Sequence, residues 1–312
     1  MIARKMHLAA LLVICVAGFA APALGEACHL SRIAQVPMSI DVTGRINVPM
    51  TVAGKELNML IDTGAILTEL TQSTVDTLGL HPQLLNQRIE FRGVGGYRID
   101  HFVNAPDIVF GGLKAYKMPF LVQPDDAQMT RDVDGILGPD ILRAYDDDFD
   151  FANSMFSLFD AVECEGNHVW WTNDPHAEIP FTIDATGHIM IDVNLDGKTI
   201  KAVLDTGASN SMLDLDIAQD KFAFDDKDPK LEKRPAGTKS GFAYKYPFKA
   251  LSFGGETENN VTVLNPVLEL MKHDDIAVHD IRVLVGINIL RRLHLYISYK
   301  NRMIYVTPAS AH

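Results

Sequence analysis

The sequence predicts an all-β protein, mainly strands with a few short helices, built from two similar halves. Three observations support this prediction. The chain repeats its own motifs at a fixed spacing, each half consists of short runs rich in Val, Ile, Leu, Phe and Tyr, and glycine-containing turns separate those runs. Long segments with helical periodicity are few. This pattern is typical of small β-domains arranged in tandem.

The internal repeat is clearest in two motifs. Asp41-Val-Thr43-Gly44 recurs as Asp184-Ala-Thr186-Gly187, and Asp62-Thr63-Gly64-Ala65 recurs as Asp205-Thr206-Gly207-Ala208, both after 143 residues. Because unrelated matches would not keep one spacing, the chain is a duplication.

Further along, the register of the repeat changes. Ile136-Leu137-Gly138 matches Leu284-Val285-Gly286, which requires a net insertion of five residues in the second half. The expected place is the charged stretch Asp220 to Lys233 or the loop Gly237 to Gly241, since polar, Gly- and Pro-containing sequence tolerates changes of length.

The predicted elements follow from these runs in chain order. Strands are expected at Ile46 to Val52, Leu57 to Ile61, Ile89 to Arg92, Ile99 to Val103, Met155 to Phe159, Ile189 to Val193, Ile200 to Leu204 and Met303 to Val306. Short helices are expected at Thr71 to Leu78, Asp140 to Tyr145 and Asn288 to Leu293. The predicted organisation is a leader at 1–25, an N-terminal lobe at 26–160, a connection at 161–178 and a C-terminal lobe at 179–312.

The first residues read as a secretory signal peptide. Arg4 and Lys5 precede the apolar run Leu8 to Ala21, and small residues follow, with cleavage expected near Gly25. That run is short for a membrane span, and no later segment has the roughly 18 uninterrupted apolar residues that a spanning helix needs. The sequence therefore predicts an exported protein, periplasmic or secreted, with no integral membrane segment in its mature part.

Two cysteines remain after the predicted leader, Cys28 and Cys164. An exported chain can form disulfides, so one bridge between them is the expectation, with two unrelated free thiols as the alternative.

The charge of the chain excludes one class of partner. Lys and Arg number 28 against 40 Asp and Glu, which gives a formal net charge of −12, and loss of Arg4 and Lys5 with the leader lowers it to −14. Nucleic acid is therefore not expected as a partner, because phosphate binding needs a basic surface.

The repeated Asp-Thr-Gly motif carries the candidate chemistry. In each half an apolar run ends at an aspartate, so a strand delivers Asp62 or Asp205 to a tight turn. Gly64 and Gly207 permit close approach of another backbone. Thr63 and Thr206 could each reach across to the other turn with a hydroxyl. Two such turns related by a pseudo-twofold axis would set the aspartates face to face, and carboxylates that close share one proton.

With its two Asp-Thr-Gly-Ala turns and the downstream Ile136-Leu137-Gly138 and Leu284-Val285-Gly286, the chain resembles the aspartic peptidases, both pepsin-like and retroviral-type (retropepsin-like), over nearly its whole mature length. The resemblance implies two acid-protease β-barrel lobes in a single chain, in which each apolar-apolar-Gly strand supports an Asp-Thr-Gly loop from behind. It also implies an aspartic endopeptidase with a peptide or protein substrate. In these enzymes generally, the ionised aspartate activates a water and the protonated one supports the oxyanion, without metal or organic cofactor.

The resemblance also implies a β-hairpin flap over the substrate. The candidate is the glycine-rich tip that contains Gly93, Gly95, Gly96 and Tyr97, with a second-half counterpart around Gly237 to Phe242. Alanine after each Asp-Thr-Gly, at Ala65 and Ala208, is the retroviral-type pattern, but the Arg of the retroviral Gly-Arg-Asp/Asn pattern is missing. The sequence thus favours a tandem fusion of two retropepsin-like units in which a monomer can be complete.

Two other functions remain as alternatives. A duplicated fold could persist as a non-catalytic peptide-binding or assembly protein, although both aspartates are present. A metal-dependent hydrolase would need ligand spacing among histidines, and His101, His168, His176 and His188 show none, so no metal site is expected.

Overall fold

The computed structural model describes residues 30–86, 91–93, 97–125, 133–160, 169–173, 175–225, 227–236, 240–254, 260–272 and 282–310. The predicted leader with Cys15, and the predicted Cys28–Cys164 bridge, lie outside these residues. No helix within the described part of the chain has the length and apolar character to cross a membrane.

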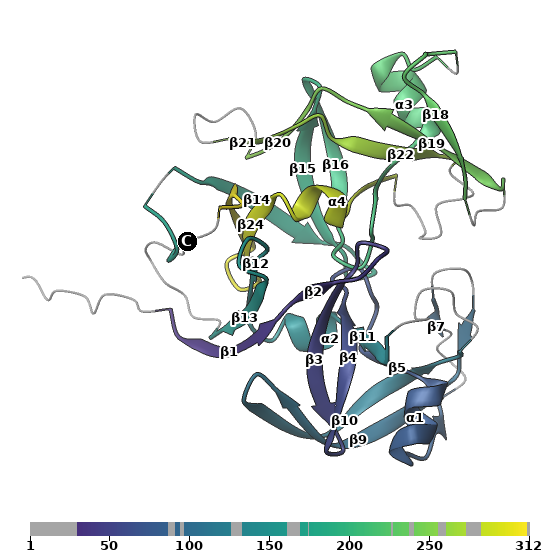
Figure 1. The fold of residues 1–312 in the computed structure, drawn as a ribbon, viewed down its shortest axis with the longest axis vertical. Coiled ribbons are helices and arrows are strands. Elements are labelled where there is room, and N and C mark those ends of the chain that lie inside the picture. The colour runs from purple at the N-terminus through teal and green to yellow at the C-terminus, as the bar shows by residue number, and fades with distance from the viewer. Residues whose placement is uncertain are drawn as a thin grey trace, which may run out of the picture.

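The described residues form a mainly β structure of two lobes joined by a shared sheet (Figure 1). The N-terminal lobe contains β2 (Ser39–Ile40), β3 (Ile46–Val52), β4 (Lys55–Ile61), β5 (Glu69–Thr71), α1 (Gln72–Leu78), β6 (Gln83–Leu84), β7 (Phe91–Arg92), β8 (Arg98–Ile99), β9 (His101–Phe110), β10 (Leu113–Gln123), β11 (Gly135–Leu137) and α2 (Pro139–Leu142).

The C-terminal lobe repeats this plan. It contains β15 (Ile189–Leu195), β16 (Lys198–Leu204), β17 (Ser211–Asp214), α3 (Leu215–Phe222), β18 (Glu232–Pro235), β19 (Phe242–Pro247), β20 (Ala250–Phe253), β21 (Val261–Leu264), β22 (Val267–Met271), β23 (Val283–Val285) and α4 (Ile287–Leu290). The shared sheet is made of β1 (Arg32–Pro37), β12 (Asp146–Asp150), β13 (Met155–Phe159), β14 (Ala177–Ile183), β24 (Leu293–Ser298) and β25 (Met303–Pro308).

The N-terminal lobe closes into a barrel. Its strand order is β3-β4-β11-β5-β10-β9, and β9 returns to pair with β3. The order in the second lobe is β15-β16-β23-β17-β22-β19, and here β20 pairs with β15. Each of the two long strands of the first lobe, β9 and β10, thus corresponds to two shorter strands in the second lobe. Asn265, which has a positive φ of 50°, lies between β21 and β22. Lys117, with φ of 56°, marks the corresponding kink inside β10.

Strand pairing shows where the second half is longer. Glu69 pairs with Leu121 in the first lobe, and Met212 pairs with Glu269 in the second. Glu69 and Met212 are separated by the 143-residue spacing of the first part of the repeat. Leu121 and Glu269 are separated by the spacing found further along, which is five residues longer. The insertion therefore lies between Met212 and Glu269, a range that includes both predicted places.

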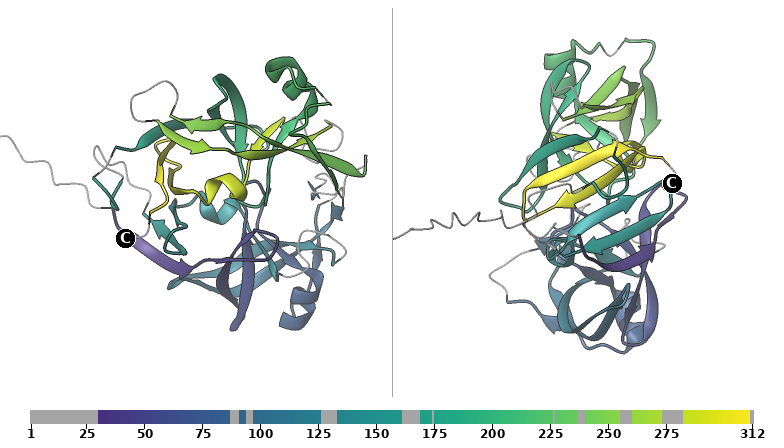
Figure 2. Two further views of the ribbon diagram at one scale, coloured as in Figure 1. Left: turned by 45° about the horizontal axis from the view of Figure 1, so that its top comes forward. Right: turned by 90° about the vertical axis from the view of Figure 1, so that its left-hand side faces the viewer.

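The two lobes meet through one pair of strands at the centre of the shared sheet. β12 and β24 are antiparallel, and the register sets Asp148 opposite Tyr296. These two residues occupy equivalent positions of the repeat, so the pseudo-twofold axis passes between them. The right-hand view of Figure 2 shows the yellow strands of the C-terminal end beside the teal strands β12 and β13.

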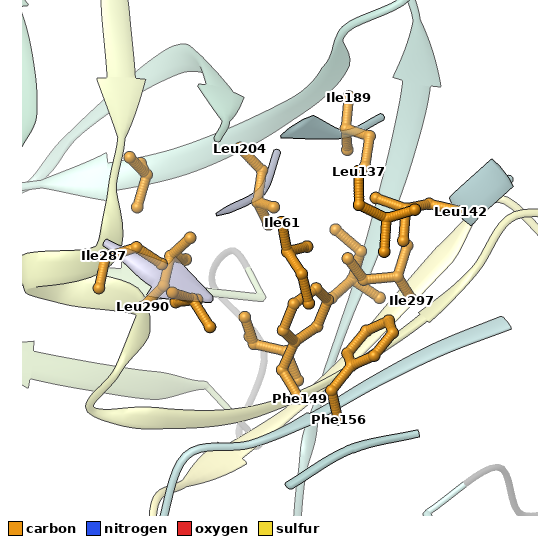
Figure 3. Packing of buried hydrophobic residues seen from close by; sticks show 14 of the residues in the cluster. Ile61, Leu137, Leu142, Phe149, Phe156, Ile189, Leu204, Ile287, Leu290 and Ile297 are labelled. Atoms are coloured by element: carbon orange, nitrogen blue, oxygen red, sulfur yellow. The ribbon is translucent and has the colours of Figure 1, made fainter. Parts of the chain in front are cut away.

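Apolar side chains from both lobes pack against this sheet in one continuous core. Ile61 and Leu204, the residues before the two candidate aspartates, lie above Phe149 and Ile297 of the central strand pair (Figure 3). All four side chains are fully buried. Burial of this kind contributes roughly 1.5–3 kcal/mol for each large apolar side chain, and it fixes the ends of β4 and β16 on a common base.

Most predicted elements match the described ones to within a few residues. The predicted helices correspond to α1, α2 and α4, and Thr71 caps α1 through its hydroxyl, which accepts from the backbone N–H of Thr74. Two differences stand out. Helix α3, capped by Asp214, was not predicted, because it runs into the charged stretch that begins at Asp220, and β14 begins at Ala177, within the predicted connection.

Candidate active site

The two Asp-Thr-Gly turns lie next to each other and face one another, at the ends of β4 and β16. The backbone N–H of Asp62 donates to the carbonyl of Leu137 at 3.1 Å, and that of Asp205 donates to the carbonyl of Val285 at 3.1 Å. Strands β11 and β23 thus hold the turns from behind, since each runs parallel to the strand that ends in the aspartate. The structure therefore gives the repeated apolar-apolar-Gly segments a supporting position.

Thr63 and Thr206 connect the turns to each other. The Thr63 hydroxyl donates to the carbonyl of Leu204 at 3.0 Å and accepts from the N–H of Thr206 at 3.1 Å. The Thr206 hydroxyl makes the matching bonds, to the carbonyl of Ile61 at 3.0 Å and from the N–H of Thr63 at 3.0 Å. Both threonines are buried. Four crossed hydrogen bonds therefore fix one aspartate relative to the other.

Gly64 and Gly207 let the carboxyl groups come close. A Cβ atom on Gly207 would lie 2.2 Å from Cγ of Asp62, and one on Gly64 would lie 2.6 Å from Cγ of Asp205. Each carboxyl group therefore rests against the glycine of the opposite turn, where a side chain has no space. The N–H of Gly64 donates to Asp62 and that of Gly207 donates to Asp205, both at 2.8 Å.

The two carboxyl groups share an electrostatic environment that favours protonation. Burial raises the pKa of Asp62 well above its ordinary value, and the negative charge of Asp205 raises it further. Burial also raises the pKa of Asp205, while hydrogen bonds from the Gly207 N–H and from Asp62 oppose the rise. Such a pair holds one proton between its two members over a range of pH.

Beneath each turn, a hydroxyl and a polar side chain form the same small network. In the first lobe Asp140 accepts from the N–H and the hydroxyl of Thr68, both at 2.7 Å. In the second lobe Asn288 accepts from the N–H and the hydroxyl of Ser211, at 2.7 and 2.8 Å. The Asp140 and Asn288 that the sequence offers without the expected Arg therefore hold β5 and β17 in place.

The flap candidate is a hairpin in its described part. β7 pairs with β8 in antiparallel register, and the N–H of Gly93 donates to the carbonyl of Tyr97 at 3.0 Å. The hydroxyl of Tyr97 accepts from the side-chain amide of Gln123, at the end of β10. Gly95 and Gly96 lie outside the described residues. Of the predicted second-half counterpart, Gly237 to Phe242, residues 237–239 lie outside the described part of the chain; the flanking strands β18 and β19 pair in antiparallel register.

Sequence reasoning missed two residues beside the dyad. His188 is buried, contacts the carbonyl of Gly64 at 3.2 Å through Nε2, and its charge lowers the pKa of Asp205. The available signal was its position directly after the repeated turn, which Arg45 occupies in the first half. Glu69 is also buried, and its charge adds to the raised pKa of Asp62.

Two of the other histidines that were considered as metal ligands contact neighbouring carboxylates. His101 contacts Asp100 at 2.6 Å and His176 contacts Glu178 at 3.4 Å, while His168 falls outside the described part of the chain. Over the described ranges, no group of three or more His, Cys, Asp or Glu side chains is arranged to hold a metal ion.

Comparison with known proteins agrees with this geometry. A family model described as aspartyl protease matches residues 48–141 and 191–287, which is more than half of the chain and one segment in each lobe. Among solved structures, basic 7S globulin from soybean matches with a TM-score of 0.57 and 11% sequence identity, covering 91% of this chain and 96% of that one. This likeness concerns the fold alone. No curated protein matches. The chain belongs to the aspartyl protease family, with the pepsin-like fold of two lobes.

Proposed function

We propose that this protein is an aspartic endopeptidase that hydrolyses peptide bonds with a water held between Asp62 and Asp205. The observation that carries the proposal is the intact dyad. Both carboxyl groups are buried, each lies against the glycine of the opposite turn, and the crossed threonine bonds hold them in register. A fold kept only for binding would not need either aspartate in this arrangement.

The reaction uses the one proton that the pair retains. The ionised carboxylate takes a proton from the water, whose oxygen attacks the peptide carbonyl carbon, and the protonated carboxyl group donates to the developing oxyanion. Collapse of the tetrahedral intermediate breaks the C–N bond, and the leaving nitrogen takes a proton from the pair. The dyad then returns to its single-proton state, so the cycle needs no further reactant than water.

The surroundings of the two carboxyl groups differ in detail. Burial and the charge of Asp205 raise the pKa of Asp62, whereas the rise that burial causes in the pKa of Asp205 is opposed by hydrogen bonds from the Gly207 N–H and from Asp62. In this proposal the two aspartates hold the proton as a pair, and the member that is ionised acts as the general base.

The predicted leader extends the proposal to location. A chain exported through residues 1–25 would act in the periplasm or outside the cell, on a peptide or protein substrate. Fractionation of cells that express the full chain, with N-terminal sequencing of the product, tests this part: a mature protein that starts near Glu26 supports it.

The test of activity is cleavage of a mixed peptide library by the wild-type protein, beside Asp62→Asn and Asp205→Asn, from acidic to neutral pH. We expect new peptide termini with the wild type and a loss of at least about 10³-fold in either variant, the range seen when a residue of a catalytic unit is removed. Thr43→Ser, in a surface turn, is the matched control. If the wild type cleaves nothing, or if cleavage survives both substitutions, the protein is a peptide-binding or assembly module instead.

A further inference from the structure

Glu69 and Gln123 form a buried polar cluster on the N-terminal-lobe side of the dyad. In the parallel pair of β5 with β10, Leu70 lies opposite Val122, and both pack in the lobe core. Side chains alternate along a strand, so Glu69 and Gln123 project from the opposite face. Glu69 is only 4% exposed and Gln123 is 0% exposed. The side-chain amide of Gln123 donates to the hydroxyl of Tyr97 in the hairpin, and Glu69 is close enough to Asp62 and Tyr97 to influence the pKa of both, so the cluster lies near the dyad and the hairpin.

The cluster contains acceptors that nothing in the described chain satisfies. Oε2 of Glu69 and Oε1 of Gln123 are buried without a hydrogen-bond partner among the described residues, while the amide nitrogen of Gln123 donates to the hydroxyl of Tyr97. A buried polar group without a partner destabilises the folded protein. Two oxygens without a partner in the described chain are the pattern of a site that can accept hydrogen bonds from another molecule.

Ionisation of Glu69 would leave a negative charge without a balancing cation in the described part of the chain. Burial raises the pKa of Glu69 to about 8, the nearby charge of Asp140 adds to it, and no cation among the described residues opposes the shift. The second lobe differs at the same positions, where Met212 replaces Glu69 and Asn288 replaces Asp140. The carboxylate of the second lobe that pairs with Met212, Glu269, has Lys245 at 3.9 Å. The need for a cation is therefore particular to the N-terminal lobe.

We propose that Glu69 and Gln123 form a subsite for a basic side chain, Lys or Arg, of a peptide next to the bond that the dyad addresses. A lysine ammonium has three donors and an arginine guanidinium has five, so either can satisfy both free acceptors at once. Tyr97, which is only partly buried, covers the cluster from the hairpin side. The peptide's role as substrate rests on the proposed endopeptidase function, but its binding does not.

Binding of the cation is coupled to loss of the Glu69 proton. The groups that face Glu69 are Asp62, Asp140 and the hydroxyl of Tyr97, and none of them supplies a positive charge. Glu69 is therefore mostly protonated at neutral pH, and an arriving ammonium group must displace that proton. The preference for a basic over an uncharged side chain should rise by up to about tenfold per pH unit below pH 8 and level off above it.

The test is peptide binding to the protein carrying Asp205→Asn, so that no cleavage occurs. The probe is a set of octapeptide pools in which each position in turn is fixed as Lys, Arg or Met and the rest are degenerate, with the bound fraction quantified by mass spectrometry. We expect Lys and Arg to exceed Met by about tenfold or more at one position. The excess should disappear in Asp205→Asn/Glu69→Met, which copies the second lobe, and in the size-matched Asp205→Asn/Glu69→Gln.

Glu269→Gln on the same background is the matched control, because it removes the partly buried carboxylate beside Met212 in the second lobe and should leave the excess unchanged. Circular dichroism of each variant confirms that it is folded. The inference is overturned if no position favours a basic side chain, or if the excess persists without Glu69. An absence of cleavage by the wild-type protein would instead defeat the proposed activity, and this binding experiment would still decide on the subsite.

Discussion

The hydroxyl of Thr63 lies in the turn of the opposite lobe, 3.0 Å from the carbonyl of Leu204 and 3.1 Å from the N–H of Thr206. This contact joins residues far apart in the chain and fixes the separation of the two aspartates. Thr63→Val should therefore destabilise the protein by about 2–4 kcal/mol, because two buried backbone groups lose their partner. Urea denaturation measures the change. Thr63→Ser keeps the hydroxyl and should stay within about 1 kcal/mol of the wild type; equal losses in both variants would contradict the role of the hydroxyl.

Gly207→Ala should abolish most of the activity without unfolding the protein. The added Cβ would fall 2.2 Å from Cγ of Asp62, so the carboxyl group must move. Displacement of a reacting group by about 1 Å costs on the order of 10²-fold in rate. The measurement is kcat/KM on a peptide that the wild type cleaves, with Ala208→Ser in the next position as control. Wild-type kinetics for Gly207→Ala would show that the two turns do not approach each other this closely.

The pH profile of kcat/KM should be bell-shaped, with its alkaline limb well above the ordinary aspartate pKa of 3.8. Burial raises the pKa of both Asp62 and Asp205, so the pair keeps its shared proton to higher pH than isolated aspartates would. Activity is lost on the alkaline side when that proton leaves, and on the acidic side when a second one binds. An alkaline limb near pH 4 would disprove a strongly perturbed dyad.

The buried pair of Asp148 and His294 at the lobe junction should be needed for stability. Nε2 of His294 lies 2.8 Å from Asp148, both side chains are buried, and the ring of Trp171 stacks on His294 at 3.9 Å between centroids. His294→Leu should cost about 3–5 kcal/mol, since it leaves Asp148 buried without its partner. The double variant Asp148→Leu/His294→Leu should recover part of this loss. Calorimetric unfolding checks both, and an additive double variant would refute the coupling.

Acid should destabilise the protein through Asp41 and Asp184. Their pKa values fall to about 2: burial opposes the decrease, and hydrogen bonds from Thr43 and Thr186, with those of the neighbouring backbone, outweigh it. Because the folded pKa is lower than the unfolded one, the stabilisation is complete above about pH 4 and disappears as pH falls through 2. At pH 7, Asp41→Asn and Asp184→Asn should therefore each have a lower urea midpoint than the wild type. At pH 2.5 this difference in midpoint should be smaller. If the difference in urea midpoint is the same at both pH values, ionisation of these aspartates does not contribute to stability.

The repeat made the fold and the dyad predictable from the sequence alone. Two motifs at one spacing imply pseudo-twofold symmetry, and that symmetry brings Asp62 to Asp205 without any knowledge of the other strands. The crossed bonds of Thr63 and Thr206 follow from the same symmetry.

Glu69 and His188 could not be predicted in the same way, because their roles depend on which face of a strand or turn they occupy and on residues far away in the chain. Glu69 reads as one polar residue in the run Thr68 to Thr71, and only its pairing with β10 turns it away from the lobe core. Helix α3 was missed because the charged stretch that begins at Asp220 reads as a loop. The Asp214 carboxylate caps the helix by accepting from the N–H groups of Asp216 and Ile217, and Leu215, Ala218 and Phe222 pack with the lobe core.

The pairing of Asp148 with Tyr296 on the pseudo-twofold axis has a consequence for the history of the chain. In a homodimer of either half, each residue on the axis would face its own copy. In the same register, two copies of the first half would set Asp148 against Asp148 and Asp146 against Asp150, with no histidine between them. The two halves have therefore diverged at this strand pair, and two copies of the first half could not re-form the junction as it now stands.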